Sequence, residues 1–274
     1  MLLCRIAKVS TSGYYRWLEH REEPEKDYDD YLLIKTVFDK GKGKRGSRTI
    51  KMKMAKDGIR MNLKKIQRIM KKYGLETKTR RKNPYKMIMK KTAEHRTAPN
   101  ILSRDFKQIV PHKAFSTDIT YLWWNHQFVY LSVIKDLATG EAVAWKTSRR
   151  LEMPLVMETI EALIRNKSIE SLKDILIHSD QGFHYTNPLY IQKLKDLKMI
   201  QSMSRKGNCI DNSPIESFFG HLKDDLDYKN CKTFEELSFC VDEYMGYYNN
   251  ERQQWERKKM TPVEYRNHLL KSDG

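Results

Sequence analysis

Three acidic residues occupy apolar settings in which a carboxylate is costly. Asp118 lies within a predicted strand, Asp180 follows directly on the apolar segment ILIH, and Glu216 stands in the first turn of a predicted helix. A buried carboxylate needs a cation or several hydrogen bonds to compensate its charge. Carboxylate oxygens are hard ligands that suit Mg²⁺ or Mn²⁺. Three such residues at strand ends and a helix start would hold divalent cations if the fold brings them together.

Each of these acids also has an ordinary structural explanation. Asp118 would face solvent if its strand lay at a sheet edge, and Asp180 would cap a turn. Glu216 would complement the positive end of its helix. Asp136 competes with Asp118, because it too ends an apolar strand. The residue pattern by itself leaves these alternatives open.

The elements that must position these acids have the pattern of an α/β sheet protein. Clusters of β-branched and aromatic residues predict strands over 115–123, 128–136, 142–147, 175–178 and 200–203. Apolar residues at helical spacing predict helices over 153–165, 187–197, 213–226 and 234–249, and Thr261-Pro262 opens another. Three strands in a row followed by alternating helices and strands predict an antiparallel meander that feeds a parallel part. The expected result is a mixed sheet with helices on its faces.

The positive charge of the chain is concentrated in its first part. The net charge is +17, yet residues 1–107 carry 30 Lys and Arg against 12 Asp and Glu, while residues 108–274 carry 22 against 23. Such an excess indicates a polyanionic partner. A solvated basic surface is the alternative, but residues 40–91, with 21 basic and 2 acidic residues, also show apolar helical spacing. This combination favours a module that grips nucleic acid.

Helical spacing in this basic part predicts three short helices, over 29–39, 48–56 and 62–73. The third is strongly basic, and Gly74 stands where a C-cap belongs. Three short helices with tight turns suit a helix-turn-helix arrangement, although any small helical bundle gives the same pattern. The basic stretch 79–91, which contains Pro84, has the character of a linker.

Several other classes of protein are disfavoured. The four cysteines form no C-x-x-C pair and no zinc-type spacing with histidine, so we expect free thiols. No apolar run approaches the roughly 18–20 residues that a membrane helix needs. Arg5 and Lys8 interrupt the apolar start of the chain, and no signal-peptide cleavage site follows. We therefore expect a cytoplasmic protein without a membrane partner.

The linked acidic motifs resemble those of one family. The first Asp lies in FSTDITYL, the second in IHSDQGFHY, and the Glu, after 35 intervening residues, in NSPIESFFGHLK. Residues 113–266 resemble the catalytic core of retroviral integrases and bacterial insertion-sequence transposases, the DDE recombinases. The segments VSTSGYYRW, YYNNERQQ and TPVEY, with the basic helices, resemble the downstream reading frame of two-frame insertion sequences. The resemblance covers nearly the whole chain, and its linked spacing is far more specific than one short motif.

This resemblance implies a fold and an activity. The fold would be an RNase H-like mixed five-stranded sheet flanked by helices, preceded by a small all-α basic module of the helix-turn-helix type. The activity would be that of a DDE-type polynucleotidyl transferase, a transposase. In it Asp118, Asp180 and Glu216 bind two Mg²⁺ or Mn²⁺ ions, and DNA strands are cut at the ends of a mobile element and transferred. His178 and His184, which flank the second Asp, are expected to pack or hydrogen-bond rather than act as the base.

Double-stranded DNA would be the partner, both as the terminal inverted repeats of the element and as target DNA. Lys223 stands about two helical turns beyond Glu216, so it points the same way and would contact a phosphate; an exposed helical lysine is the alternative. Candidates for further contacts to the DNA backbone are Arg45, Arg48, Lys64, Lys65, Arg68, Arg80 and Arg81. The pairs Trp123-Trp124 and Tyr247-Tyr248 offer surfaces for base stacking, with packing in the protein as the alternative.

Two short segments depart from the family pattern. Family members often carry Tyr-Gly-Tyr-Arg-Arg where this chain has Arg45-Gly46-Ser47-Arg48-Thr49. They often carry Arg-Pro-His where this chain has Arg252-Gln253-Gln254. Both segments lie outside the three acids, so the departures concern contacts with DNA rather than the chemistry.

We expect five segments along the chain. They are a short helical N-terminal segment over 1–27, the basic helical module over 28–78, a basic linker over 79–112, the catalytic core over 113–228 and a C-terminal helical extension over 229–274. The resemblance also implies a homo-oligomer on DNA, the upstream-frame protein as a further partner, and a nucleoid-associated location in a bacterium. Two other functions stay open. One is a DNA-binding regulator without catalysis, and the other is a metal-dependent nuclease that cuts without joining.

Overall fold

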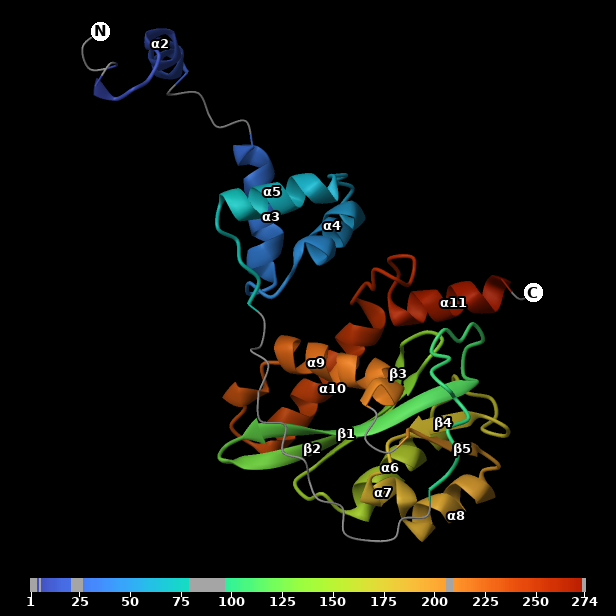
Figure 1. The fold of residues 1–274 in the computed structure, drawn as a ribbon. Coiled ribbons are helices and arrows are strands. Elements are labelled where there is room, and N and C mark those ends of the chain that lie inside the picture. Colours follow the sequence, from blue (N-terminus) through green and yellow to red (C-terminus); the bar gives the residue numbers. More distant parts are fainter. Residues whose placement is uncertain (1–3, 5, 21–26, 79–96, 206–208, 273–274) are drawn as a thin grey trace. The chain divides into compact units, whose positions relative to one another are not determined.

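The computed structural model describes residues 4, 6–20, 27–78, 97–205 and 209–272. The chain divides into two compact units, Met1–Lys78 and Thr79–Gly274. Figure 1 shows the helices of the first unit and the sheet of the second. Among the described residues, no helix is both long enough and apolar enough to cross a membrane.

The first unit is helical. Its described helices are α2 (Thr11–Glu19), α3 (Tyr28–Lys40), α4 (Ser47–Lys56) and α5 (Leu63–Lys72). The helix α5 begins after Asn62, whose side chain accepts the N–H of Lys64 at 2.9 Å. Helices α3, α4 and α5 bury a shared core that includes Ile34, Ile50 and Ile66. The three helices predicted over 29–73 are therefore confirmed, with bounds that differ by one residue or less.

The second unit is built on a five-stranded sheet in the order β3-β2-β1-β4-β5. Its strands are β1 (Ala114–Trp124), β2 (Gln127–Asp136), β3 (Ala142–Ser148), β4 (Leu176–Ser179) and β5 (Ile200–Met203). Strands β1, β2 and β3 pair antiparallel, and β4 pairs parallel with both β1 and β5. The predicted mixed sheet, an antiparallel meander that feeds a parallel part, is confirmed.

Helices cover both faces of this sheet (Figure 1). The described helices of this unit are α6 (Met153–Ile164), α7 (Phe183–Thr186), α8 (Pro188–Asp196), α9 (Ser213–Asp225), α10 (Phe234–Asn250) and α11 (Pro262–Ser272), with 3₁₀ turns η1 (Cys209–Asn212) and η2 (Tyr228–Asn230), and α11 packs on α10. One core cluster joins the sheet to α6 and α8, through Ile160 and Leu194. A second joins the opposite face to α9 and α10, through Phe218 and Val241. The element α7 and both 3₁₀ turns were not predicted from the sequence.

The described end of the predicted linker is part of the sheet unit. The backbone N–H groups of Ile101 and Leu102 donate to Ser202 Oγ at 3.0 and 3.1 Å. The N–H of Met203 donates to the carbonyl of Pro99 at 3.2 Å. Residues 97–106 therefore lie along β5, fixed by these backbone hydrogen bonds, while most of their side chains are exposed. This differs from the expectation of a basic linker that extends to residue 112.

The C-terminal helices are attached at the β2–β3 turn. The side chain of Asn249 both accepts the N–H of Ala142 and donates to its carbonyl, at 3.0 and 2.9 Å. Arg266 donates to both carboxylate oxygens of Glu141 at 2.7 Å. Since both contacts are buried or half-buried, residues 234–272 complete the sheet unit.

Candidate active site

Asp118 and Asp180 are brought to the same level of the sheet by the pairing of β1 with β4. Ser116 pairs with His178 in this parallel ladder. Each aspartate lies two residues beyond that pair, Asp118 within β1 and Asp180 directly after the end of β4. Because side chains alternate along a strand, a step of two residues keeps the same face. The two carboxylates are therefore neighbours, and both are half-buried.

Backbone N–H groups hold one oxygen of each carboxylate. The N–H of Ile119 donates to Asp118 Oδ1 at 2.7 Å, and the N–H of Gly182 donates to Asp180 Oδ1 at 2.7 Å. A Cβ atom at Gly182 would lie 2.7 Å from that same oxygen of Asp180. Only glycine therefore allows this close approach of the backbone to the carboxylate.

The negative charges of Asp118 and Asp180 both affect the pKa values of the same two tyrosines, Tyr121 and Tyr185. Burial, then Tyr130, Asp118 and Asp180, raise the pKa of the Tyr121 hydroxyl. Burial is also the main cause that raises the pKa of Tyr185, and again both aspartates add to it. Two carboxylates that act on one pair of hydroxyl groups make a shared region of negative potential. Such a region attracts cations.

Glu216 comes from the helix that covers the sheet face on which Asp118 lies. Asp118 pairs with Val133 of β2, and directly opposite residues of an antiparallel pair share a face. Val133 packs in the core cluster with Ile215 and Phe218 of α9. Glu216 lies in the first turn of α9 and is exposed. Its neighbours Ile215 and Phe218 are buried against the sheet, so the packing of the apolar face of α9 determines the position of the Glu216 backbone.

The three acids do not form a closed cluster. Among residues 97–205 and 209–272, and in the described part of the helical unit, no three side chains of His, Cys, Asp or Glu lie close enough together to hold a metal ion. The sheet brings Asp118 and Asp180 together, and Glu216 approaches from α9 without completing the group. The donor set itself, carboxylate oxygens on a half-buried surface, has the chemistry that Mg²⁺ prefers.

The competing Asp136 has a structural role. It is fully buried, and its Oδ2 accepts the hydroxyl of Thr139 at 2.7 Å and the N–H of Thr139 at 3.2 Å. It pairs with Phe115, which packs on the opposite face of the sheet from Val133. Burial raises the pKa of Asp136. It therefore closes the β2–β3 turn on the face away from Asp118.

The histidines on either side of Asp180 are buried. His178 Nδ1 lies 2.9 Å from Ser202 Oγ, a hydrogen bond between β4 and β5. Burial lowers the pKa of both His178 and His184. Both are placed for packing and hydrogen bonding, the role expected from the sequence.

Several of the basic residues proposed for DNA contact make contacts within the helical unit. Arg68 donates to both carboxylate oxygens of Asp27 at 2.7 and 2.8 Å. Lys65 forms an ion pair with Asp30, and Arg45 Nη1 donates to the carbonyl of Val37 at 3.1 Å. These contacts join α5 to α3 and fix the loop before α4.

The other proposed DNA contacts are placed differently. Lys64 and Arg48 have exposed side chains on α5 and α4, and Lys223 lies half-buried in the last turn of α9. Arg80 and Arg81 lie outside the described residues.

The aromatic pairs divide between surface and core. Trp123 is exposed and Tyr247 half-buried. Trp124 is buried, and its indole N–H donates to the carbonyl of Cys231 at 2.7 Å. Tyr248 is buried, and its hydroxyl accepts from Gln254 at 3.0 Å. Packing therefore accounts for one member of each pair.

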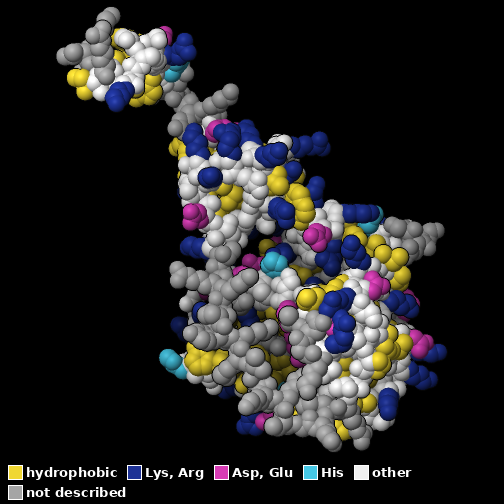
Figure 2. All heavy atoms as spheres, viewed as in Figure 1, with side chains coloured by type: hydrophobic (Ala, Val, Ile, Leu, Met, Phe, Trp, Pro, Cys, Tyr) yellow, Lys and Arg dark blue, Asp and Glu magenta, His cyan; other side chains and the backbone are white. Residues whose placement is uncertain are grey.

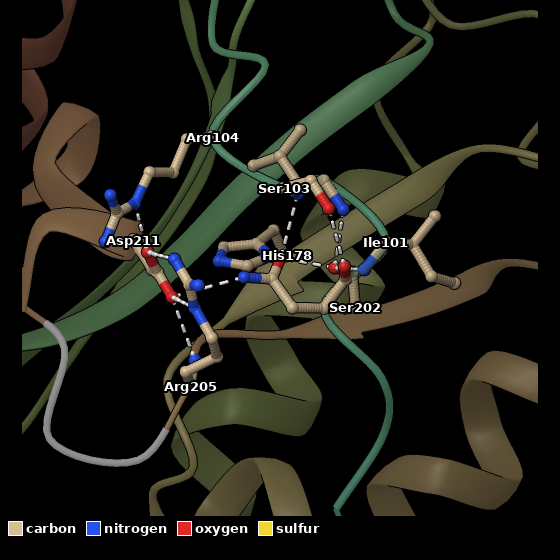
Figure 3. A network of polar contacts seen from close by, with 9 residues as sticks. Ile101, Ser103, Arg104, His178, Ser202, Arg205 and Asp211 are labelled. Atoms are coloured by element: carbon tan, nitrogen blue, oxygen red, sulfur yellow. Dashed lines mark hydrogen bonds and ion pairs between the residues drawn. The ribbon is translucent and has the colours of Figure 1, made fainter.

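Sequence reasoning missed a buried polar network in front of α9. The carboxylate of Asp211, in η1, accepts hydrogen bonds from Asn100, Arg104 and Arg205. Figure 3 shows Arg104 and Arg205 converging on it. The only local signal is an acid shortly before a helix start, which is typical of an ordinary cap. The partners Asn100 and Arg104 lie more than 100 residues away, where no spacing pattern reaches.

Comparison with known proteins identifies the family. Residues 110–209 match the integrase core domain family, residues 216–270 match a second integrase core domain family, and residues 25–83 match the HTH-like domain family. The chain is 34% identical over 266 residues to the putative transposase InsK for insertion sequence element IS150 of Escherichia coli K12. That match covers 97% of this chain and 92% of InsK. The chain belongs to the insertion-sequence transposases with an integrase core.

Further similarities agree with this assignment. The transposase is 38% identical over 216 residues to an uncharacterized transposase-like protein of Haemophilus influenzae, which covers 78% of this chain and 97% of that protein. Its fold is similar to a chain of the simian T-cell lymphotropic virus intasome, solved in complex with PP2A regulatory subunit B56 gamma. The TM-score is 0.50 at 16% identity, over 75% of this chain and 67% of that chain. At that identity the likeness concerns the fold alone. The RNase H-like core, the helix-turn-helix-like region and the transposase family are confirmed, and DNA is the partner that this family implies.

Proposed function

We propose that this transposase is a DDE-type polynucleotidyl transferase that cuts DNA strands at the ends of a mobile element and joins them to DNA. The proposal assigns Asp118, Asp180 and Glu216 as the residues that bind two Mg²⁺ or Mn²⁺ ions. The observation that carries it is the register of β1 with β4, which sets Asp118 and Asp180 side by side. The packing of α9 on the face of Asp118 supports the addition of Glu216.

The residues of this chain would divide the work as follows. Gly182 and Ile119 hold one oxygen of each aspartate through their N–H groups. Divalent cations bound at the carboxylates would polarise the scissile phosphate and lower the pKa of the attacking hydroxyl. The chain itself orients the strand and neutralises phosphate charge, with Lys223 as the proposed contact beside the acids. No covalent bond between protein and DNA is required.

The helical unit would grip the substrate. Its basic charge and its match to the HTH-like family support contact with the terminal inverted repeats through residues 28–78. The exposed Lys64 and Arg48 are the proposed contacts to the DNA backbone. Arg45, Lys65 and Arg68 would act mainly by shaping the unit, and Arg80 and Arg81 would follow the backbone beyond it. We further propose a homo-oligomer on DNA, the upstream-frame protein as a partner, and a cytoplasmic, nucleoid-associated location.

A strand-cleavage assay tests the proposal. End-labelled duplex that carries the terminal repeat of the chain's own element is incubated with the full chain and Mg²⁺, and the products are resolved on a denaturing gel. Wild type is compared with Asp180→Asn and with the matched control Asp174→Asn. Asp174 lies in an exposed loop at φ 60°, a conformation that asparagine tolerates. Cleaved and joined products are expected with wild type and Asp174→Asn, and neither with Asp180→Asn.

Each other outcome selects a different function. Cleavage without joined products would favour a metal-dependent nuclease. Binding of the duplex with no product in any variant would favour a DNA-binding regulator of the element. Equal products from wild type and Asp180→Asn would overturn the assignment of the acids.

A further inference from the structure

The carboxylate of Asp211 lies at the point where three segments of the sheet unit meet. It belongs to the 3₁₀ turn η1, two residues before α9 begins and five before Glu216. Its side chain is fully buried. It accepts from Arg104 Nε at 2.6 Å, from Asn100 Nδ2 at 3.1 Å, and from the backbone N, Nε and Nη2 of Arg205 at 3.0, 2.9 and 3.0 Å. Five donors on one buried carboxylate occupy its accepting positions completely.

This arrangement keeps the carboxyl group of Asp211 in its charged form. The hydrogen bond from Arg205 is the main cause that keeps the pKa of Asp211 well below its usual range, and Arg104 acts in the same direction. Asp211 is therefore ionised wherever the protein is folded near neutral pH. A buried, ionised carboxylate with two arginine partners is strongly oriented, since losing both arginines would leave an uncompensated buried charge.

The donors connect Asp211 to the pair of strands β4 and β5, and Asp180 follows directly on β4. Asn100 and Arg104 belong to the segment 97–106 that lies along β5. Ile101 and Leu102 of this segment donate to Ser202 Oγ, which is also bonded to His178 Nδ1 at 2.9 Å. Figure 3 shows Ile101, Ser202 and His178 on one side of the network and Asp211 with its arginines on the other. Through Ser202, the segment thus links β4, which ends one residue before Asp180, to the turn η1 that precedes α9.

The start of α9 depends on this network because ordinary capping is absent there. Asn212 occupies the N-cap position but makes no side-chain capping hydrogen bond, and its buried Oδ1 has no partner among the described residues. Ile215 and Phe218 fix the helix against the sheet, but apolar contacts are non-directional and do not by themselves fix its rotation or height. A second polar contact, from Lys135 Nζ to the carbonyl of Pro214 at 3.3 Å, acts on the same turn.

We propose that Asp211, held by Arg104 and Asn100, is a positioning residue that sets the first turn of α9 and thereby the distance of Glu216 from Asp118 and Asp180. The proposal rests on the proposed function, because it concerns the approach of the third acid to the other two. Since residues 97–106 contact both η1 and β5, and β5 pairs with the strand β4 that precedes Asp180, this segment fixes the spacing between that part of the sheet and the helix that carries Glu216. Loosening Asp211 would leave the fold intact and weaken cation binding.

Mn²⁺ titration followed by thermal unfolding tests this inference without any use of activity. The full chain is melted at rising MnCl₂ concentrations. Because Tm keeps rising with ligand concentration, the apparent Kd for Mn²⁺ is fitted to the whole curve, and this Mn²⁺ midpoint is compared between variants. Asp211→Asn is expected to raise this midpoint about tenfold, the low end of the loss caused by removing a group bonded to a metal ligand, because Asp211 acts on Glu216 through η1 and α9 rather than by direct contact. Arg104→Ala is expected to raise it less, because Arg205 remains, and Arg104→Lys to restore part of the loss.

Two controls make the outcome decisive. Glu141→Gln breaks another buried carboxylate–arginine pair, with Arg266, at the β2–β3 turn. It is expected to lower Tm without metal while leaving the Mn²⁺ midpoint at the wild-type value. Arg104 has a partly exposed side chain, so Arg104→Ala carries the test if Asp211→Asn does not fold.

The inference and the proposed function fail in different ways. The inference is overturned if Glu216→Gln raises the Mn²⁺ midpoint while Asp211→Asn and Arg104→Ala leave it at the wild-type value. If Glu216→Gln and Asp180→Asn also leave it unchanged, the metal site itself is wrong.

Discussion

The backbone of Gly182 fixes the position of the Asp180 carboxylate. Its N–H bonds to Oδ1 at 2.7 Å, and the space where a side chain would begin is occupied by that oxygen. The backbone at Gly182 has φ −64° and ψ 154°, values that any residue adopts. An alanine there would therefore act through its methyl group and not through backbone strain.

We expect Gly182→Ala to slow strand cleavage by about 100-fold, because an error of about 1 Å in the position of a catalytic group has that effect. The rate of product formation on labelled terminal-repeat duplex is the measurement. Gly220→Ala in α9 is the matched control, since no heavy atom lies within 4 Å of its added Cβ. A wild-type rate for Gly182→Ala would show that the close approach to Asp180 has no catalytic importance.

For single residues, the sequence was informative where the polarity of a residue differed from that of its neighbours. Asp118 and Asp180 stood out because acids are rare within and directly after apolar strands. Arg68 and Lys65 were proposed as DNA contacts because the sequence shows that a side chain is basic but not which acid it pairs with. Their acids, Asp27 and Asp30, precede them by tens of residues and meet them only when α3 packs on α5. The same limit hid Asp211.

The strand β2 carries a lysine in the core between sheet and helix. Lys135 is buried, and its Nζ lies 5.7 Å from the centre of the Phe218 ring as well as near the carbonyl of Pro214. Burial, with a contribution from Arg257 and Arg252, lowers the pKa of Lys135 to about 7. In the unfolded chain the same amine titrates at the ordinary lysine value of about 10.4.

This difference predicts how stability depends on pH. Between about pH 7 and 10 the unfolded state binds the extra proton, so the free energy of unfolding rises with pH, by at most about 1.4 kcal/mol per unit for one proton. Lys135→Met lacks this contribution. Its stability relative to wild type should therefore be most favourable at pH 7 and decline towards pH 10. Urea unfolding at several pH values measures it, and a constant difference would contradict a lowered pKa.

The helix α10 contains a glycine that packing does not require. Nothing lies within 4 Å of a Cβ built on Gly246, which is exposed in the middle of the helix. Gly246→Ala is expected to raise the free energy of unfolding by about 1 kcal/mol, the usual difference in helix propensity. Thermal unfolding of the full chain measures this change, and a fall in Tm would reveal a contact that packing does not explain.

Most elements were predictable because their patterns are local. Strands such as β1 alternate or cluster β-branched and aromatic residues, and α9 and α10 carry apolar residues at helical spacing. The 3₁₀ turn η1 and the segment 97–106 have no such periodicity. Their conformation depends on hydrogen bonds to β5 and Asp211, whose partners lie about 100 residues apart in the sequence. Tertiary contacts of this kind leave no local pattern.

On the scale of the whole molecule, the excess of basic residues and the three proposed catalytic acids lie in different units. The helical unit carries the basic excess, but part of it is neutralised internally by Asp27 and Asp30. The structure thus distinguishes basic residues that are paired with acids of the unit, Arg68 and Lys65, from the other basic residues of its surface. Lys64 is exposed, whereas Arg68 is held in a two-pronged contact with Asp27.

This separation gives a test by salt titration. Lys64→Gln should weaken binding of the full chain to duplex DNA and reduce the slope of log K against log salt by about 1, the loss of one phosphate contact. Arg68→Gln removes the partner of a nearly buried acid, so it should instead lower the temperature at which the helical unit melts. Fluorescence anisotropy and circular dichroism measure the two effects. The reverse assignment, with Arg68→Gln alone changing the slope, would make Arg68 rather than Lys64 the contact to the DNA backbone.

The parallel pairing of β1 with β4 also has a consequence for the chain during synthesis. The helical unit has its own hydrophobic core within the first 78 residues, so every chemical group it needs emerges early from the ribosome. Asp118 gains its neighbour only after β4 has been made, and α9 comes later still. A chain that stops between these points would hold DNA without the proposed means of cutting it. If the helical unit binds element ends as proposed, incomplete translation products would occupy those ends and reduce the frequency of transposition.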